Sequence, residues 1–591
     1  MTTSVTTCLQ SDRDPRIAGF HKYCCIFSCG NQAQYKIDEL YAILDDLQLA
    51  LPGCIEVHDL DSPYLFVYLP DDNSAITVCS RSFIMKKIMR YWVTVPDIAA
   101  WEVAIARKYE NIDENQCTQD ILFNRLQSFI HSRFTQSSTL RFKLEIHRHG
   151  VGKGFTKEGF EQLVDRLIYT LKAACECAGA ATTSAPWAGQ VDLVNPVLVL
   201  CFWEGLSSVH SSAATTLVAL PGECSSDLVK ERRDDTCTAP NTKEIHVGRL
   251  IFDNSKKSSK IVDTFHLRKG RPFLGPTSMD CELAFIMCTL AGCSKGKIVL
   301  DPFVGSASIL VSATRLGALC VGCDIDMRIL SGKGIDKTSR STIADNFLHY
   351  GLTPPDILCS SQNCRAWRRG QQGSGMEGYF DAIVTDPPYG VRAGARKISS
   401  AVSSSRLINF DSESGRKEKG SSPQLSVECE RDIAEETMKG KKNKRPASVP
   451  YSTVECLDDL LDLAAEVLVM GGKLVFFVPS SSSIFPSTPS VSTSSSSEGI
   501  ESQNMAERYM SHPCLERVSF SEDTSSVGRG KSVLRRHLLV LRKVAPWAGS
   551  SMVSNLARQR AKRNNDDRDI DICVRDIGAS VYKDSRRKVT M

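Results

Sequence analysis

The tetrapeptide Asp386-Pro387-Pro388-Tyr389 follows the apolar stretch 381–385, and its residue types suit methylation of an amino group on a nucleobase. An exocyclic amine on a base is a poor nucleophile because its lone pair is delocalised into the ring. The Asp386 carboxylate and the Pro387 carbonyl can accept one hydrogen bond each from the two N–H groups and so make that lone pair available. The prolines stiffen the loop, and Tyr389 offers a flat face for stacking the base. A proline-rich turn after a buried strand is the alternative explanation.

A second group of residues forms a strand–turn–helix pattern upstream, in which an apolar strand ends at Asp301 and continues through Phe303 and Gly305 into a helix. Such turns let backbone N–H groups approach a cofactor. The next strand ends at Asp324, followed by Asp326, about 20 residues after Gly305, which is the spacing at which a carboxylate meets a ribose diol. A full dinucleotide signature is missing, and the pattern therefore predicts S-adenosylmethionine as cofactor. A solvated strand end or a helix cap is the alternative role for the two later aspartates.

Strands and helices must place these two groups at one edge of a sheet. From Gly248 onward strands alternate with helices, a pattern typical of a parallel sheet whose ligands bind at the carboxyl ends of the strands. The sequence therefore predicts an α/β Rossmann-like methyltransferase domain over residues 248–545. Two Ser-rich or basic insertions, 394–450 and 480–504, interrupt it and cannot bury enough apolar surface to order themselves.

The rest of the chain divides into five expected segments. Hydrophobic periodicity predicts a small α+β domain at 19–95 and a second α+β unit at 96–205. Polar composition predicts a disordered N-terminus at 1–18 and a linker at 206–247. Residues 546–591 are expected to form a basic, flexible tail.

Charge, cysteine spacing and apolar runs limit the classes of protein to which this chain can belong. Lys and Arg (72) nearly balance Asp and Glu (68), so the net charge of +4 does not by itself indicate a nucleic-acid partner. The 23 cysteines lack metal-ligand spacing, and we expect reduced thiols, no metal site and a cytoplasmic protein. The N-terminus lacks the apolar core of a signal peptide, and the longest apolar run, 197–203, is too short to span a membrane.

Several stretches resemble the eukaryotic and archaeal tRNA guanine N2-methyltransferases that modify guanine 10. The similar stretches are residues 268–280, 301–308, 322–326, 346–352 and 386–390. Residues 19–95 are similar to that family's ferredoxin-like domain, and residues 96–205 to its THUMP domain, which grips the tRNA acceptor end. The resemblance implies methyl transfer from S-adenosylmethionine to guanine N2 in tRNA, a class I methyltransferase domain and, in the eukaryotic branch, a small zinc-binding activator subunit.

The resemblance also implies roles for individual residues. Asp386, Pro387, Pro388 and Tyr389 would hold the guanine amine. The implied cofactor contacts, from the methionine end to the ribose, are Thr277, Ser278, Met279, Asp301, Phe303, Gly305, Asp324 and Asp326.

Two positions depart from the family pattern. The family's Gly-Thr-Gly-Ser turn reads Gly305-Ser306-Ala307-Ser308 here, and a Cβ at Ala307 limits how the backbone can bend. Where the family often has an Asp that contacts the adenine amine, this chain has Ser361, and Asn363 is the expected substitute.

Two other functions stay open at this point. The tetrapeptide would also serve an enzyme that methylates adenine or cytosine in DNA or another RNA. A tRNA-binding protein that has lost catalysis is the second alternative, favoured by Ala307, Ser361 and the insertion beside the active loop. The RNA-gripping domain argues against the first alternative, and the intact residues 386–389 argue against the second.

Overall fold

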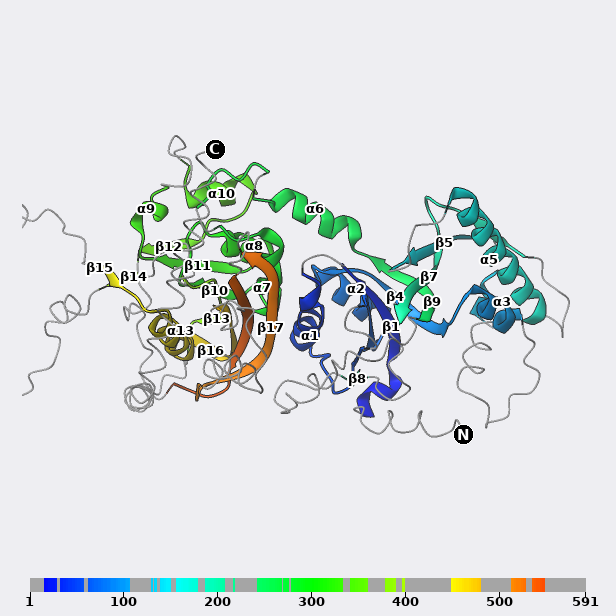
Figure 1. Ribbon diagram of the computed structural model, residues 1–591, viewed down its shortest axis with the longest axis horizontal. Helices are drawn as coiled ribbons and strands as arrows, with labels where there is room; N and C mark the ends of the chain where they lie inside the picture. The colour runs from blue at the N-terminus through cyan, green and yellow to red at the C-terminus, as the bar shows by residue number, and fades with distance from the viewer. Residues whose placement is uncertain are drawn as a thin grey trace, which may run out of the picture.

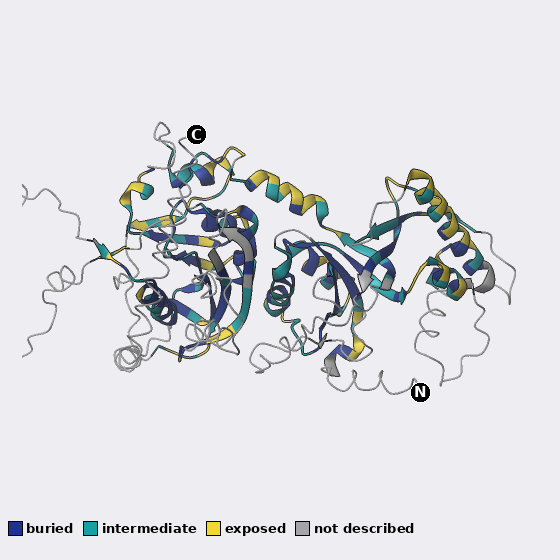
Figure 2. Ribbon diagram, viewed as in Figure 1, coloured by how far each residue is buried: buried dark blue, intermediate teal, exposed yellow. Residues whose placement is uncertain are grey.

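The computed structural model contains two large sheets that lie side by side along the long axis of the molecule, and a separate two-stranded sheet (Figure 1). Helix α6 (Ser255–Phe265) leads from the N-terminal sheet to the C-terminal one. Buried residues follow the strands of both sheets, whereas α6 exposes much of its length (Figure 2). The structure describes residues 15–28, 32–57, 62–106, 129–130, 132–134, 139–149, 156–178, 187–207, 216–217, 242–267, 269–275, 278–332, 341–359, 378–388, 396–398, 448–479, 512–527 and 534–547.

The N-terminal sheet has nine strands in the order β6-β5-β7-β9-β4-β1-β3-β2-β8. Strands β5 and β7 are parallel, whereas β4 and β9 pair antiparallel and join the two predicted α+β units into one sheet. The elements are η1 (Pro15–Gly19), β1 (His21–Phe27), η2 (Ala33–Tyr35), α1 (Lys36–Asp46), β2 (Ile55–Val57), β3 (Tyr64–Leu69), α2 (Asp72–Arg81), β4 (Met85–Val95), α3 (Ile98–Ala106), β5 (Leu140–Arg148), α5 (Lys157–Ala178), β6 (Gly189–Val191), β7 (Leu198–Ser207), β8 (Thr216–Leu217) and β9 (Thr242–Asp253).

The C-terminal sheet has seven strands in the order β12-β11-β10-β13-β16-β18-β17. Strands β12 to β16 in that order are parallel, and β18 and β17 are antiparallel to their neighbours. The elements are α7 (Cys281–Leu290), β10 (Ile298–Asp301), α8 (Ser308–Arg315), β11 (Leu319–Asp324), α9 (Met327–Leu330), α10 (Ile343–His349), β12 (Asp356–Cys359), β13 (Phe380–Thr385), α13 (Thr453–Val467), β16 (Leu468–Pro479), β17 (Leu515–Val527) and β18 (Leu534–Lys543).

Helix α1 of the N-terminal part packs directly on the C-terminal sheet and on α7. One core of buried apolar side chains contains Leu40 and Ile43 of α1 together with Phe285 of α7, and the Phe83 ring stacks on Phe285 at 5.3 Å between centroids. The carboxylate of Asp45 pairs with Lys473 at 2.9 Å and with Arg542 at 2.6 Å. The two parts are therefore joined by both apolar and ionic contacts.

Some expected segment limits fall inside regular elements. Strands β8 and β9 lie in the predicted linker 206–247, and β9 extends across the predicted start of the methyltransferase domain at residue 248. Helix η1 lies at the end of the predicted disordered N-terminus and buries Ile17. These segments are ordered because they pair with or pack on the N-terminal sheet, and such long-range pairing leaves no local composition signal.

The insertion predicted at 394–450 has structure at both ends. Strand β14 (Arg396–Ile398) pairs antiparallel with β15 (Ser448–Pro450), so the two ends of the insertion meet as a short ribbon. Its interior, residues 480–504, most of 1–18 and the tail after residue 547 lie outside the described residues. Among the described helices, none is both long enough and apolar enough to cross a membrane.

Candidate active site

Asp301 ends strand β10 and lies at the centre of the candidate site. Its buried Oδ1 accepts hydrogen bonds from the Phe303 N–H at 3.0 Å and from the Thr385 hydroxyl at 2.7 Å. Burial raises the pKa of Asp301 to about 7, and the charges of Asp324 and Asp386 add to that rise. The carboxylates of the predicted cofactor half and of the predicted amine half are therefore close enough to act on each other electrostatically.

The turn after β10 holds Ala307 in the left-handed conformation, with φ of 63° and ψ of 30°. Gln48 is the only other non-glycine residue with positive φ in the described part of the chain. This conformation favours glycine because a Cβ crowds the following carbonyl, at a cost of about 1–2 kcal/mol. The chain therefore adopts the bend that a glycine would adopt here, and Ala307, which is fully buried, carries the strain.

Asp324, at the end of β11, binds the backbone of this turn. Its Oδ2 accepts a hydrogen bond from the Gly305 N–H at 3.0 Å, and its Oδ1 accepts one from the Asp326 N–H at 2.8 Å. Burial raises the pKa of Asp324. Each carboxylate oxygen can accept a further hydrogen bond, so Asp324 retains the capacity to bind a ribose hydroxyl.

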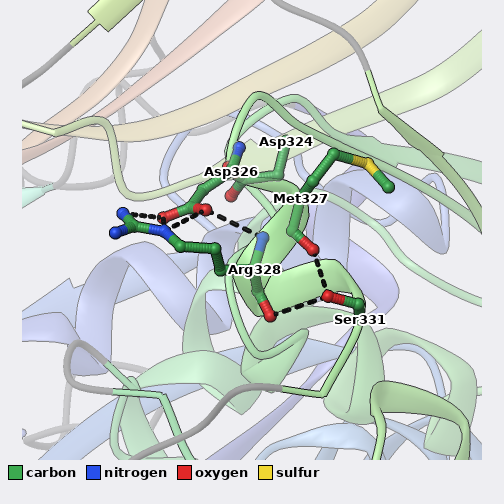
Figure 3. Close-up of polar contacts among 5 residues, drawn as sticks. All are labelled: Asp324, Asp326, Met327, Arg328 and Ser331. Carbon is green, nitrogen blue, oxygen red and sulfur yellow. Dashed lines mark hydrogen bonds and ion pairs between the residues drawn. The ribbon is translucent and has the colours of Figure 1, made fainter. Parts of the chain in front are cut away.

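Asp326 is engaged differently, as Figure 3 shows. Its Oδ1 accepts a hydrogen bond from the Arg328 N–H at 2.9 Å and so caps α9, and its Oδ2 lies 2.7 Å from Arg328 Nη2. The hydrogen bond from the Arg328 side chain lowers the pKa of Asp326. Asp326 thus has the helix-cap role that was the alternative, and of the two aspartates Asp324 fits the ribose role better.

Ser278 and Met279 lie in the segment before α7, and Ser278 contacts the turn after β10. The Ser278 hydroxyl lies 2.7 Å from the Ser306 hydroxyl and accepts a hydrogen bond from the Gly275 N–H at 3.0 Å. Met279 is buried in the core. Of the predicted methionine-end residues, Ser278 therefore lies beside the turn that carries the predicted central residues.

Two buried residues that received no role from the sequence hold this segment in place. Asn346 of α10 accepts a hydrogen bond from the Phe273 N–H at 2.8 Å and donates one to the Phe273 carbonyl at 2.9 Å. Arg271 donates through Nη1 to the Ser308 hydroxyl at 3.0 Å. Both residues lie in stretches that resemble the family, and this resemblance could have identified them as site residues.

The Asp386 loop follows β13 without a break. Pro387 is buried, whereas Asp386 and Pro388 are partly exposed. Asp386 Oδ2 lies 3.2 Å from Nη1 of Arg536, which stands on β18. Sequence reasoning missed Arg536 because no spacing links it to the tetrapeptide.

The remaining predicted site residues cannot be placed in this arrangement. Thr277, Asn363 and Tyr389 lie outside the described residues, as does Ser361. Within the described part of the chain, no group of three or more His, Cys, Asp or Glu side chains is arranged to hold a metal ion. Described cysteines such as Cys320 are buried, and burial raises the pKa of Cys320 to about 12, which keeps the thiol protonated.

Comparison with known proteins supports the same assignment. Residues 268–352 match the family model described as the RMKL-like methyltransferase domain. The tRNA (guanine(10)-N(2))-methyltransferase TRMT11 of Rattus norvegicus is 30% identical over 535 residues, which is 88% of this chain and 88% of that protein. The protein of the same name from Bos taurus is 30% identical over 84% of this chain and 82% of its own length. The structure of TrmN from Thermus thermophilus is 14% identical, covers 89% of this chain and 100% of its own, and has a TM-score of 0.31.

These matches confirm the class I methyltransferase fold and the family that the sequence motifs resemble. The family match extends well beyond the catalytic domain, because it includes most of the N-terminal half. We conclude that this chain belongs to the tRNA (guanine(10)-N(2))-methyltransferase family.

Proposed function

We propose that this protein transfers a methyl group from S-adenosylmethionine to the exocyclic N2 amine of guanine 10 in tRNA. The observation that carries the proposal is the meeting of two half-sites on adjacent parallel strands. Asp301 ends β10 and Asp386 follows β13, so both carboxylates lie at the same edge of the sheet. Relatives that are 30% identical over most of the chain are named for this reaction.

The residues at the end of β10 and β11 fit a cationic cofactor. The negative charges of Asp324 and Asp386 disfavour the ionised form of Asp301, and both contribute to its raised pKa. A positive sulfonium would offset that effect. When bound, S-adenosylmethionine supplies a methyl group already activated by its positive sulfur.

The chain's own task is then to position the amine. The Asp386 carboxylate and the Pro387 carbonyl accept hydrogen bonds from the two N–H groups, which directs the nitrogen lone pair toward the methyl group. Stacking on Tyr389 would hold a guanine that has turned out of its helix. Positioning supplies most of the rate acceleration in this scheme.

We propose that the N-terminal part binds the tRNA and consists of a ferredoxin-like unit followed by a THUMP unit. The second unit is supported by a separate apolar core built on parallel β5 and β7, with Trp101 of α3 and Phe142 and Phe202 of the strands buried in it. Contacts would be made mainly to sugar, phosphate and RNA shape. The domain limits predicted from the sequence remain part of this proposal.

A small zinc-binding activator subunit is the proposed protein partner, and the cytoplasm the proposed location. Support for a partner comes from exposed apolar side chains on β10, β11 and β12. Ile298 pairs with Leu319, and both are exposed, as is Leu358 on the edge strand, at 37%, 62% and 42%. Exposed apolar side chains on three neighbouring strands favour a covering protein.

The test is nucleoside mass spectrometry of tRNA from cells with and without the gene. Loss of N2-methylguanosine at position 10, restored by the wild-type chain but not by Asp386→Ala, would support the proposal. Unchanged N2-methylguanosine at that position would exclude it. A methylated adenine or cytosine lost in its place would support the alternative substrate, and direct binding of S-adenosylmethionine would argue against a protein that only binds tRNA.

A further inference from the structure

Arg536 reaches the proposed catalytic carboxylate from a distant part of the chain. The two residues are 150 positions apart, yet Arg536 Nη1 lies 3.2 Å from Asp386 Oδ2. Strand β18 runs antiparallel to β16, and the register pairs Arg536 with Pro479 at the carboxyl end of β16. Arg536 therefore enters the same edge of the sheet at which the parallel strands carry their loops.

The guanidinium of Arg536 is held on two further sides. Its Nε donates to Asp523 Oδ2 at 2.7 Å, and Asp523 is its register partner on β17. Its central carbon lies 3.8 Å from the centroid of the buried Phe477 ring. One edge, one face and one terminal nitrogen each have a defined neighbour, so the planar group is fixed in orientation before any substrate binds.

We propose that Arg536 is a positioning residue that fixes the Asp386 carboxylate by holding Oδ2, and so directs the other oxygen toward the base amine. This inference rests on the proposed function. A carboxylate that is held at one oxygen loses rotational freedom before the substrate binds. The positive charge also opposes the repulsion that Asp301 exerts on Asp386 from β10.

Arg536 makes one more contact than a purely structural ion pair with Asp523 would require. Asp523 is 1% exposed and already neutralises Arg536 within the β17–β18 hairpin. The terminal nitrogen is nevertheless directed to Asp386, whose side chain is 32% exposed and can be solvated by water. Since Asp523 already supplies a buried counter-charge, the contact of Arg536 with the partly exposed Asp386 points to a role at Asp386.

The experiment uses the full-length chain, co-expressed with the activator subunit, and transcribed tRNA. Arg536→Gln, Arg536→Lys, Asp386→Asn and the double variant Asp386→Asn/Arg536→Gln are compared by single-turnover methylation. The matched control is Lys297→Gln, because Lys297 also pairs with an aspartate, Asp381, near the start of β13 and away from Asp386.

We expect Arg536→Gln to lower the methylation rate about 10- to 100-fold, the range for residues that orient a catalytic group. The KM for S-adenosylmethionine should stay within about twofold, since the lost interaction acts on the amine. Lysine should restore part of the rate through its charge. The double variant should be no slower than Asp386→Asn alone, because Arg536 acts through that carboxylate.

Two results would overturn the inference: a wild-type rate for Arg536→Gln, or a loss in the double variant equal to the product of the single losses. If Arg536→Gln does not fold, Asp523→Asn replaces it, because this change keeps the arginine but weakens its anchor, and a wild-type rate would again count against the inference. A wild-type chain that fails to methylate guanine 10 contradicts the proposed function itself. An active wild type with an equally active Arg536→Gln contradicts only the positioning role.

Discussion

The two halves of the candidate site are held in place in different ways. In the cofactor half, Gly305 is bound by Asp324, and both belong to successive strand–turn–helix units of one continuous segment. In the amine half, Asp386 is held by Arg536 from a strand near the end of the domain. The contact between Gly305 and Asp324 needs only two successive units to fold, whereas the contact between Asp386 and Arg536 forms only when the whole sheet is assembled.

The largest expected effect is in the amine half. Replacing Asp386 by Ala should lower the methylation rate about a thousandfold, as the loss of a preorganised hydrogen-bonding group does. Binding of S-adenosylmethionine, measured by calorimetry, should change far less. The control is Asp381→Asn at the other end of β13, where Asp381 accepts from the Ile298 N–H at 2.8 Å. Full methylation by Asp386→Ala would show that this carboxylate is dispensable.

Within the cofactor half, substitutions of Asp324 and Asp326 should have different effects, the first on cofactor affinity and the second on stability. Asp324→Ala should weaken binding of S-adenosylmethionine about 10- to 100-fold, because hydrogen bonds to a charged group contribute about 1.5–3 kcal/mol. Asp326→Ala should instead lower stability by about 1 kcal/mol through loss of the α9 cap. Calorimetry and thermal unfolding distinguish the two. Equal losses of affinity would give Asp326 a cofactor role.

The pH dependence of stability should report on Asp301. Its pKa is raised from 3.8 to about 7, so between these values the native state binds more protons than the unfolded chain, and stability falls as pH rises. Asp301→Asn keeps an oxygen acceptor and removes the charge. The stability of this variant relative to wild type should therefore increase from pH 5 to pH 8 in thermal unfolding. The titration of Asp324 and Asp386 contributes to the pH dependence of both proteins and largely cancels in the comparison. A stability difference between wild type and Asp301→Asn that does not change with pH would contradict the raised pKa of Asp301.

The smallest expected effect is at Ala307. Ala307→Gly relieves the left-handed strain but adds freedom to the unfolded chain, so a net gain of about 1 kcal/mol or less is expected. The measurement is the unfolding temperature. The matched substitution Ala313→Gly in the interior of α8, where φ is helical, should have the opposite sign. A destabilised Ala307→Gly would mean that the methyl group packs more favourably than the strain costs.

The sequence predicted the parts of the site that depend on local order. The turn at Asp301 and the following Asp324 were predicted because strand, turn and helix succeed one another at a regular spacing. Asp386 was predicted because proline and aspartate have few roles after a buried strand. Asp326 was predicted to contact the ribose together with Asp324, and its hydrogen bonds with Arg328 were not predicted.

Contacts that depend on tertiary structure were not predictable in this way. Thr385 and Arg536 act through neighbours that only the sheet order provides. Strand β9 belongs to the N-terminal sheet, although the catalytic domain was predicted to begin within it, at residue 248. The left-handed Ala307 breaks a local preference, and the surrounding core compensates for it.

The core that joins α1 to α7 fixes the distance between the two large sheets. Because apolar side chains of both sheets share one buried cluster, a hinge motion between them would expose those side chains to water. A substrate held by the N-terminal sheet would therefore meet the Asp386 loop at a fixed separation. Selection of one nucleotide would then follow from the length of RNA between grip and catalytic loop, without any need to recognise the surrounding sequence.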